Sequence, residues 1–192
     1  MAINIKYILK KLWPLILLLI ISAVTVLSGM KGTFLTDFLN SYFYFALYVL
    51  VVGILAHFFG EALPRRFDCE KGFFSCHEWE DNGNFYDRVF HVKKWKDYRF
   101  DISNAFGDVR SKNPGTQRDP NELKMILQET CVAELTHWML TLISPLMLLI
   151  VQEVGRVFLL IAYICANLSD IIIQRYNRPR FLKAYKILSR NR

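Results

Sequence analysis

The segment from Glu129 to Arg180 reads ETCVAELTHWMLTLISPLMLLIVQEVGRVFLLIAYICANLSDIIIQRYNRPR. Two apolar runs in it are separated by the short polar stretch QEVG, which predicts two helices joined by a tight turn. Polar side chains interrupt the apolar runs near their outer ends. A polar side chain in hydrocarbon costs free energy, so such residues usually face a bundle interior or a water-filled site. The segment therefore predicts a helical hairpin that carries a functional site.

Four apolar runs have the length and composition of membrane-spanning helices, which need about 20 residues to cross the hydrocarbon layer. They cover residues 13–29, 41–62, 132–151 and 156–174. We therefore predict an all-α integral membrane protein, a single domain over residues 1–192 with four transmembrane helices. The first run follows lysines, as in a signal peptide, but a second span comes soon after it, so we expect the first helix to be retained.

The 192 residues are 53% hydrophobic and 21% charged, with a formal net charge of +7. Basic residues flank the apolar runs, which indicates contact with anionic lipids at these flanks and no nucleic-acid partner. Both termini, the segment 63–130 and the tail 175–192 are basic, whereas the loops 30–40 and 152–155 carry little charge. The positive-inside rule then predicts a multi-pass membrane protein with both termini and the segment 63–130 in the cytoplasm.

The segment 63–130 is rich in both aromatic and basic residues. This composition is typical of a chain lying at the head-group boundary of a membrane. RNA stacking would use similar residues, and we regard it as the poorer interpretation. Residues 112–120 (KNPGTQRDP) predict a turn, and Asp119 before Pro120 could start a helix that runs into the third span.

No metal site or cofactor is predicted. Cys69, Cys76 and His77 lie close in sequence, but no further pair of ligands completes a zinc site. Cys131 and Cys165 lie at or in apolar runs, so we expect small buried hydrophobes. His57 and Glu61, four apart on the second span, fit either an interfacial pair or a site.

Glu134 and His137 are three apart, so on a helix they project from one face. A carboxylate beside an imidazole can raise its basicity and fix its tautomer, which suits a general base. Asn167, Asp170 and Gln174 share a face of the fourth span by the same argument. A tight hairpin would turn both faces toward each other. These residues could instead only hold helices together by hydrogen bonds.

Arginines follow this polar face directly, in the order Arg175, Asn177, Arg178 and Arg180. Guanidinium groups bind phosphate or carboxylate with paired hydrogen bonds, so the cluster suits a phosphate-bearing donor. An ordinary positive flank of a membrane helix would look similar. The chain shows no phosphate-cradling glycine loop, nucleophile elbow or zinc-protease helix, which leaves direct transfer with a base as the simplest mechanism.

ETCVAELTHW and YICANLSDIIIQRYNRPR resemble the glycosyl-diaponeurosporenoate acyltransferase family, small bacterial membrane proteins of carotenoid biosynthesis. An upstream part of the chain also agrees with the motifs of this family, at Leu63-Pro64, Trp79-Glu80, Asn82-Gly83, Phe85-Tyr86 and HVKKWKD (91–97). The resemblance implies transfer of a fatty acyl group to a sugar hydroxyl of a membrane glycolipid in a bacterial cell membrane. The residues matched to its motifs are Glu134, His137, Asn167, Gln174, Arg175, Tyr176, Asn177, Arg178, Trp95, Lys96 and Asp97.

We therefore predict an acyltransferase in which His137, supported by Glu134, is the base. Asn167 and Gln174 would position the sugar or polarise the thioester carbonyl. Arg175, Arg178 and Lys96 would hold the phosphates of an acyl-CoA or acyl-carrier donor. Two alternatives stay open, a non-catalytic scaffold of a lipid-modifying complex and a transferase that moves another group onto an isoprenoid lipid.

Overall fold

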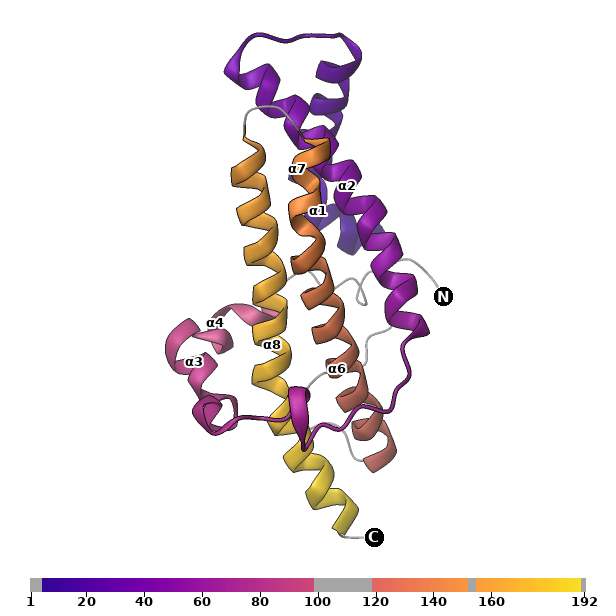
Figure 1. Cartoon of the computed structure of the whole chain (residues 1–192), viewed down its shortest axis with the longest axis vertical. Helices are drawn as coiled ribbons and strands as arrows, with labels where there is room; N and C mark the ends of the chain where they lie inside the picture. Colours follow the sequence, from indigo (N-terminus) through magenta and orange to yellow (C-terminus); the bar gives the residue numbers. More distant parts are fainter. Residues whose placement is uncertain (1–4, 99–118, 152–154, 191–192) are drawn as a thin grey trace. The chain divides into compact units, whose positions relative to one another are not determined.

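The computed structural model describes residues 5–98, 119–151 and 155–190, and within these ranges the only regular elements are helices. This confirms the all-α prediction for the described part of the chain. The elements (Figure 1) are α1 (Ile5–Leu27), α2 (Phe34–Ala62), η1 (Gly72–Phe74), η2 (Glu78–Gly83), α3 (Asn84–Phe90), α4 (Val92–Trp95), η3 (Lys96–Tyr98), α6 (Pro120–Ile143), η4 (Ser144–Leu146), α7 (Met147–Ile150) and α8 (Arg156–Arg190).

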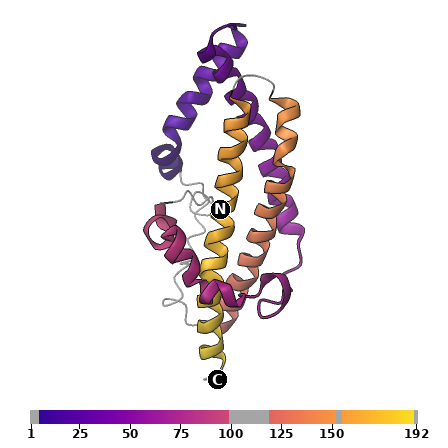
Figure 2. The ribbon, with the colours of Figure 1, turned by 60° about the vertical axis from the view of Figure 1, so that its left-hand side comes forward.

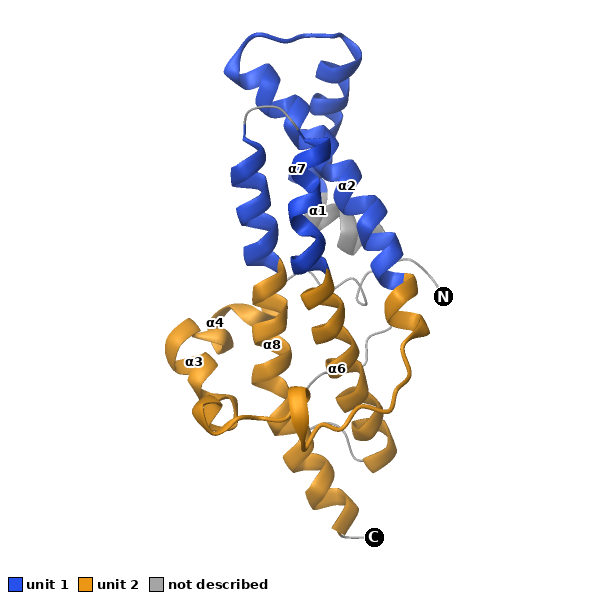
Figure 3. Cartoon of the chain, viewed as in Figure 1, with its two compact units in different colours: residues 1–57, 100–109, 140–166 blue, residues 58–99, 110–139, 167–192 orange. Residues whose placement is uncertain are grey.

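The chain divides into two compact units (Figure 3). Unit 1 comprises residues 1–57, 100–109 and 140–166, and unit 2 comprises residues 58–99, 110–139 and 167–192. The helices α2, α6 and α8 contribute residues to both units. That the whole chain is a single domain stays a prediction.

Three helical stretches in the described ranges are long and apolar enough to cross a membrane, namely Phe34–Ala62, Pro120–Ile150 and Arg156–Arg190. The four-span prediction is thus supported for its last three spans. The apolar part of α1, Trp13–Leu27, is shorter. At about 1.5 Å per residue it extends about 22 Å, less than the hydrocarbon thickness of about 30 Å.

The second span begins earlier than predicted, because α2 starts at Phe34 inside the expected loop 30–40. Thr33 and Thr36 form a reciprocal cap. The backbone N–H of Thr36 donates to Oγ1 of Thr33 at 3.2 Å, and the backbone N–H of Thr33 donates to Oγ1 of Thr36 at 3.2 Å. This arrangement satisfies backbone donors that a helix start leaves without partners, and so fixes where α2 begins.

In unit 1 the start of α8 packs against α7 and α2. Tyr48, Met147, Val151 and Leu159 form its buried core, and the hydroxyl of Tyr48 donates to the carbonyl of Ile143 at 2.9 Å. The predicted turn at 152–154 lies outside the described residues. The next residue, Gly155, has a φ of +93°, and a Cβ there would lie 2.8 Å from the Phe38 ring, so glycine is required.

In unit 2, α6 and α8 lie antiparallel and side by side (Figures 1 and 2). The predicted start of α6 is confirmed, since the Asp119 carboxylate accepts the backbone N–H of Asn121 at 3.2 Å and Pro120 opens the helix. The main buried cluster of this unit joins both helices to the incoming chain through Cys69, Leu123, Ile126, Leu127, Cys131 and Phe181.

A second cluster of unit 2 holds α3 and α4 against α8. Its buried members are Tyr86, Val92 and Tyr176. Gly83 allows the close approach, because its φ is +85° and a Cβ there would lie 2.8 Å from the backbone oxygen of Tyr176. Part of the predicted interfacial segment therefore has a folded structure built onto α8. Its residues 99–118 lie outside the described ranges.

The polar tail predicted at 175–192 is helical as far as Arg190, since α8 continues through Pro179. Cys131 is buried, as predicted, but the expectation for Cys165 is wrong, because this thiol is exposed on α8. Of the His57–Glu61 pair, the Glu61 carboxylate lies 3.7 Å from Arg65, which fits the interfacial alternative.

Candidate functional site

The carboxylate of Glu134 on α6 is fully buried and has a cation at each oxygen. Oε1 lies 2.6 Å from Nε of Arg175, and Oε2 lies 2.6 Å from Nη2 of Arg178. The indole N–H of Trp138, one turn further along α6, also points at Oε1, at 3.4 Å. A buried carboxylate is costly unless it is paired and hydrogen-bonded, so the two arginines of α8 are what allow Glu134 to be charged here.

A second buried carboxylate, Glu80 of η2, lies beside the first ion pair. Its Oε1 lies 3.3 Å from Nη1 of Arg175, and its Oε2 accepts the backbone N–H of His77 at 2.6 Å. The hydroxyl of Tyr86 donates to Oε1. Burial and this hydrogen bond raise the pKa of Tyr86, so the phenol keeps the proton that it donates.

Both guanidinium groups also donate to backbone carbonyls of the segment around η1. Arg175 donates from Nη2 to the carbonyl of Phe73 at 2.7 Å, and Arg178 donates from Nη1 to the carbonyl of Phe74 at 3.0 Å. Arg178 also donates to Oγ1 and to the carbonyl of Thr130, at 3.0 and 2.9 Å. We call Glu80, Glu134, Arg175 and Arg178 the ion-pair network. It joins α6, α8 and the segment 72–80.

That Arg175 and Arg178 hold donor phosphates stays a prediction. The Arg178 side chain is 3% exposed and that of Arg175 is 11% exposed, and both have their donors engaged by the protein. These two residues position the segment 72–80, and Glu134 is their counter-ion.

His137 lies next to Glu134 on α6, and its ring meets α8. Its Nδ1 is 2.9 Å from Oδ1 of Asn167, and its Nε2 is 3.8 Å from Oδ2 of Asp170. A proton on Nδ1 would be donated to the amide oxygen of Asn167, and Nε2 would then carry the lone pair. The His137 ring thus contacts Asn167 and Asp170, whereas the Glu134 carboxylate pairs with Arg175 and Arg178. The predicted meeting of the two polar faces is present.

Gln174 and Asn177 are half-buried on α8, and the described chain gives neither of them a hydrogen bond or an ion pair. Tyr176 is buried, and its ring is covered by Lys96, with Nζ 5.5 Å from the ring centroid, and by Arg180 at 3.6 Å. Tyr176 is therefore a packing residue of the α3–α4 contact.

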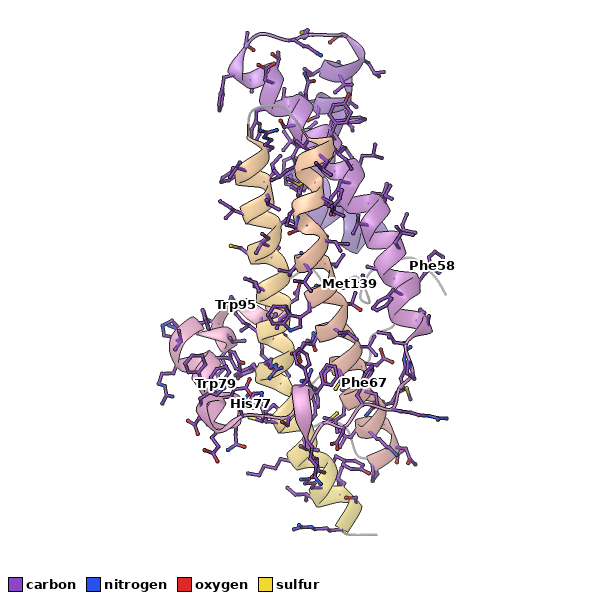
Figure 4. The ribbon with its side chains drawn as sticks, in the orientation of Figure 1. Phe58, Phe67, His77, Trp79, Trp95 and Met139 are labelled. Carbon is purple, nitrogen blue, oxygen red and sulfur yellow. The ribbon has the colours of Figure 1, made fainter. Side chains whose placement is uncertain are left out.

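Trp95 lies on the α3–α4 side of α8 (Figure 4), and Lys96 and Asp97 follow it in η3. The indole N–H of Trp95 donates to the carbonyl of Phe90 at 2.7 Å, and Lys96 lies 4.0 Å from the Asp97 carboxylate. No described hydrogen bond or ion pair joins this group to His137. The role predicted for these residues in substrate binding stays a prediction.

Sequence reasoning missed Glu80, Thr130 and Tyr86 as parts of this site. Glu80 and Tyr86 lie in the aromatic segment and become buried only because η2 and α3 fold onto α8. The sequence holds no signal that separates Glu80 from the neighbouring carboxylates Glu78 and Asp81. Among the described residues no group of three or more His, Cys, Asp or Glu side chains could hold a metal ion.

Unit 2 also has a cavity of about 750 Å³ beside the ion-pair network. It lies between the segment 69–84 and the C-terminal part of α8. Its polar lining residues are Ser75, Cys76, Glu80, Asn82, Asn84, Arg175, Arg178, Arg180, Lys183, Lys186 and Arg190. Burial raises the pKa of the Cys76 thiol at its edge, with the charge of Glu80 as a smaller cause.

Residues 70–187 match the family model described as glycosyl-4,4'-diaponeurosporenoate acyltransferase. Proteins of that name from Staphylococcus aureus are similar to the chain. The relative from strain MRSA252 is 32% identical over 157 residues, and that from strain bovine RF122 is 31% identical over 160 residues. Each match covers 80% of this chain and 93% of the relative. No solved structure matches the chain significantly.

The matched range contains the whole ion-pair network, His137 and its partners on α8, and the cavity as far as Ile187. The family match therefore spans the parts of α6, α8 and the segment 70–84 that carry these polar groups. The protein belongs to the glycosyl-4,4'-diaponeurosporenoate acyltransferase family and is an acyltransferase.

Proposed function

We propose that this acyltransferase moves a fatty acyl group from a thioester donor to a sugar hydroxyl of a membrane glycolipid, with His137 as general base. The observation that carries the proposal is the ring of His137 held between Asn167 and Asp170, at 2.9 and 3.8 Å. The printed name of the relatives supports a glycosylated carotenoid acid, or a related glycolipid, as acceptor.

In the proposed step the sugar oxygen attacks the thioester carbonyl carbon while Nε2 of His137 takes the hydroxyl proton. The C–S bond then breaks, the ester forms, and the imidazolium returns the proton to the leaving thiolate. Asp170, with its carboxylate 3.8 Å from Nε2, stabilises the positive charge on the ring during this step. Atoms and charges balance without a further reactant.

Asn167 acts as a positioning residue in this scheme, because its amide oxygen holds Nδ1 of His137. Gln174 is the better candidate to polarise the thioester carbonyl. It lies one helical turn beyond Asp170 on α8, and no described residue uses its amide group. A donor amide directed at the developing oxyanion would lower the barrier.

The acceptor's apolar chain would lie in the lipid, beside the candidate spans of α6 and α8. We place the protein in the bacterial cell membrane, with both termini and the segment 63–98 on the cytoplasmic side, since basic residues gather there. Exposed Cys76 provides the test. A membrane-impermeant maleimide should label it in inside-out vesicles and not in intact cells. Labelling of intact cells would contradict this orientation.

The test of the base is transfer of a labelled fatty acyl group to glycolipid by purified His137→Ala. Loss of a general base costs about 10²–10⁴-fold in rate, so transfer should fall by at least about 100-fold. The matched control is His57→Ala, because this histidine is exposed on α2. Both variants should elute as the wild type does in gel filtration. Undiminished transfer by His137→Ala would remove the mechanism.

A further inference from the structure

The cavity of unit 2 has a basic wall made by one face of α8. Pro179, Leu182, Lys183, Lys186 and Arg190 recur at spacings of three and four residues, which is the pattern of a single helix face. The opposite wall comes from the segment 69–84. The cavity volume of about 750 Å³ is within the range of sites for small organic ligands and cofactors.

Only some of the basic side chains in this wall have a partner within the described part of the protein. Lys186 pairs with Glu70 at 2.7 Å, and Arg180 is stacked on the Tyr176 ring. Among the described residues neither Lys183 nor Arg190 has a carboxylate within ion-pair distance, and both are exposed. The buried Glu80 carboxylate in the wall is already neutralised by Arg175. The cavity therefore offers cations to an anionic ligand.

Resting on the proposed function, we propose that this cavity binds the phosphate of a phosphopantetheine thioester, and that this thioester is the acyl donor. Arg190, about 10 Å further along α8 than Lys183, would pair with a further phosphate of a coenzyme A donor, and Lys183 would pair with the phosphate of the arm. Side-chain amides of Asn82 and Asn84, which also line the cavity, offer hydrogen bonds to its oxygens or to the amides of the arm.

The distance along α8 between His137 and the basic wall of the cavity favours this class of donor. The helix rises about 1.5 Å per residue, so Arg180 lies about 15 Å and Lys183 about 20 Å along the axis from Asp170, which is beside His137. In an acyl phosphate the carbonyl adjoins the phosphate, and in a phospholipid only a few bonds separate them. In a phosphopantetheine thioester about a dozen single bonds intervene, which span roughly 15 Å when extended. The arm and the Lys183 side chain, which leans back toward the N-terminus of α8, together join the two places.

The test is binding of coenzyme A to the detergent-purified full chain, measured by calorimetry without any transfer. Lys183→Ala/Arg190→Ala should bind coenzyme A at least tenfold more weakly than the wild type. Pantetheine, which lacks the phosphate, should bind weakly and equally to both proteins. Arg88→Ala/Lys94→Ala is the matched control, because it removes the same charges from exposed positions outside the cavity.

Holo-acyl carrier protein, used as a second ligand, identifies the source of the arm. If the wild type binds coenzyme A or holo-acyl carrier protein and the Lys183→Ala/Arg190→Ala variant does not, the proposal is supported. The ligand whose binding is lost is then the donor. Equal binding of both ligands by this variant and the wild type overturns it, as does tight binding of pantetheine. His137→Ala should bind coenzyme A as the wild type does, so failure of the donor site and failure of the proposed base give different results.

Discussion

The Nε atom of Arg175 lies 2.6 Å from Oε1 of Glu134, and this contact joins α8 to α6 inside unit 2. The same guanidinium reaches the carbonyl of Phe73 and the carboxylate of Glu80. One arginine thus joins both helices of the hairpin to the segment that covers them. The ion pair fixes where the cavity and the base lie within the unit, and touches neither substrate in our proposal.

Removing the charge of Glu134 should therefore damage the fold. In Glu134→Gln two buried guanidinium groups lose their counter-ion, and breaking a buried pair costs about 3–5 kcal/mol. We expect a clear fall in melting temperature in detergent. Glu129→Gln is the control, because this exposed partner of Arg65 should change stability by less than about 1 kcal/mol. Equal melting temperatures for both variants would show that Glu134 is not a buried counter-ion.

Asn167→Ala tests how His137 is held. Without the amide oxygen 2.9 Å from Nδ1, the ring can rotate and adopt the other tautomer. Misplacing a reacting group by about 1 Å can cost about 10²-fold in rate. We expect kcat for acyl transfer to fall by this order while KM for the donor stays unchanged. A variant with raised KM and normal kcat would instead assign Asn167 to substrate binding, as the sequence analysis predicted.

The meeting of the polar faces could be predicted from sequence, because the spacing of Glu134 with His137, and of Asn167 with Asp170, is set by helix periodicity alone. The choice of partners could not. It depends on the register of α6 against α8, which pairs Glu134 with Arg175 and His137 with Asn167.

Two other features needed tertiary information. Glu80 becomes a buried counter-ion only when the segment 72–83 folds back over α8, and aromatic composition alone indicated a surface at the head groups. The continuation of α8 past Pro179 was also missed, since a proline usually ends or kinks a helix. Lys183 and Arg190 were therefore assigned to a tail instead of a cavity wall.

Gly83→Ala and Gly72→Ala separate backbone strain from close packing. Both glycines have positive φ, +85° and +73°, so an alanine at either position costs roughly 1–2 kcal/mol. Only at Gly83 would the new Cβ meet the backbone, 2.8 Å from the oxygen of Tyr176, whereas at Gly72 nothing lies within 4 Å. We expect Gly83→Ala to lose about 2–5 kcal/mol by thermal unfolding, more than Gly72→Ala. Equal losses would contradict the packing of η2 on α8.

Cys69 and Cys131 should form a disulfide when a mild oxidant is added. Their sulfur atoms lie 3.3 Å apart, both thiols are buried, and the pair joins the incoming segment to α6. The hydrogen bond from Cys131 lowers the pKa of Cys69, so its reactive thiolate forms below the ordinary value of about 8.5.

The yield of this cross-link, measured by peptide mass spectrometry, should therefore rise with pH and reach half of its maximum at a lower pH than for a free cysteine. Cys69→Ser should abolish it without changing maleimide labelling of exposed Cys76. Oxidation that links Cys76 in place of Cys69 would contradict the packing of this segment on α6.

The stability of unit 2 should depend on the ionisation of Tyr86 at alkaline pH. Burial and the hydrogen bond to Glu80 raise the pKa of this phenol above its ordinary value of about 10. The folded state then keeps a proton that the unfolded chain releases. Its contribution to stability is fully present below about pH 10 and is lost above it, by up to roughly 1.4 kcal/mol per pH unit.

Tyr86→Phe removes this titration together with one hydrogen bond to the buried Glu80 carboxylate. The variant should melt below the wild type at pH 8, and the gap between the two proteins should narrow as the pH rises to 11. A gap of constant size across this range would show that Tyr86 titrates alike in the folded and unfolded chains. The phenol would then not be the buried hydrogen-bond donor to the Glu80 carboxylate. In that case η2 would have to pack on α8 by other contacts.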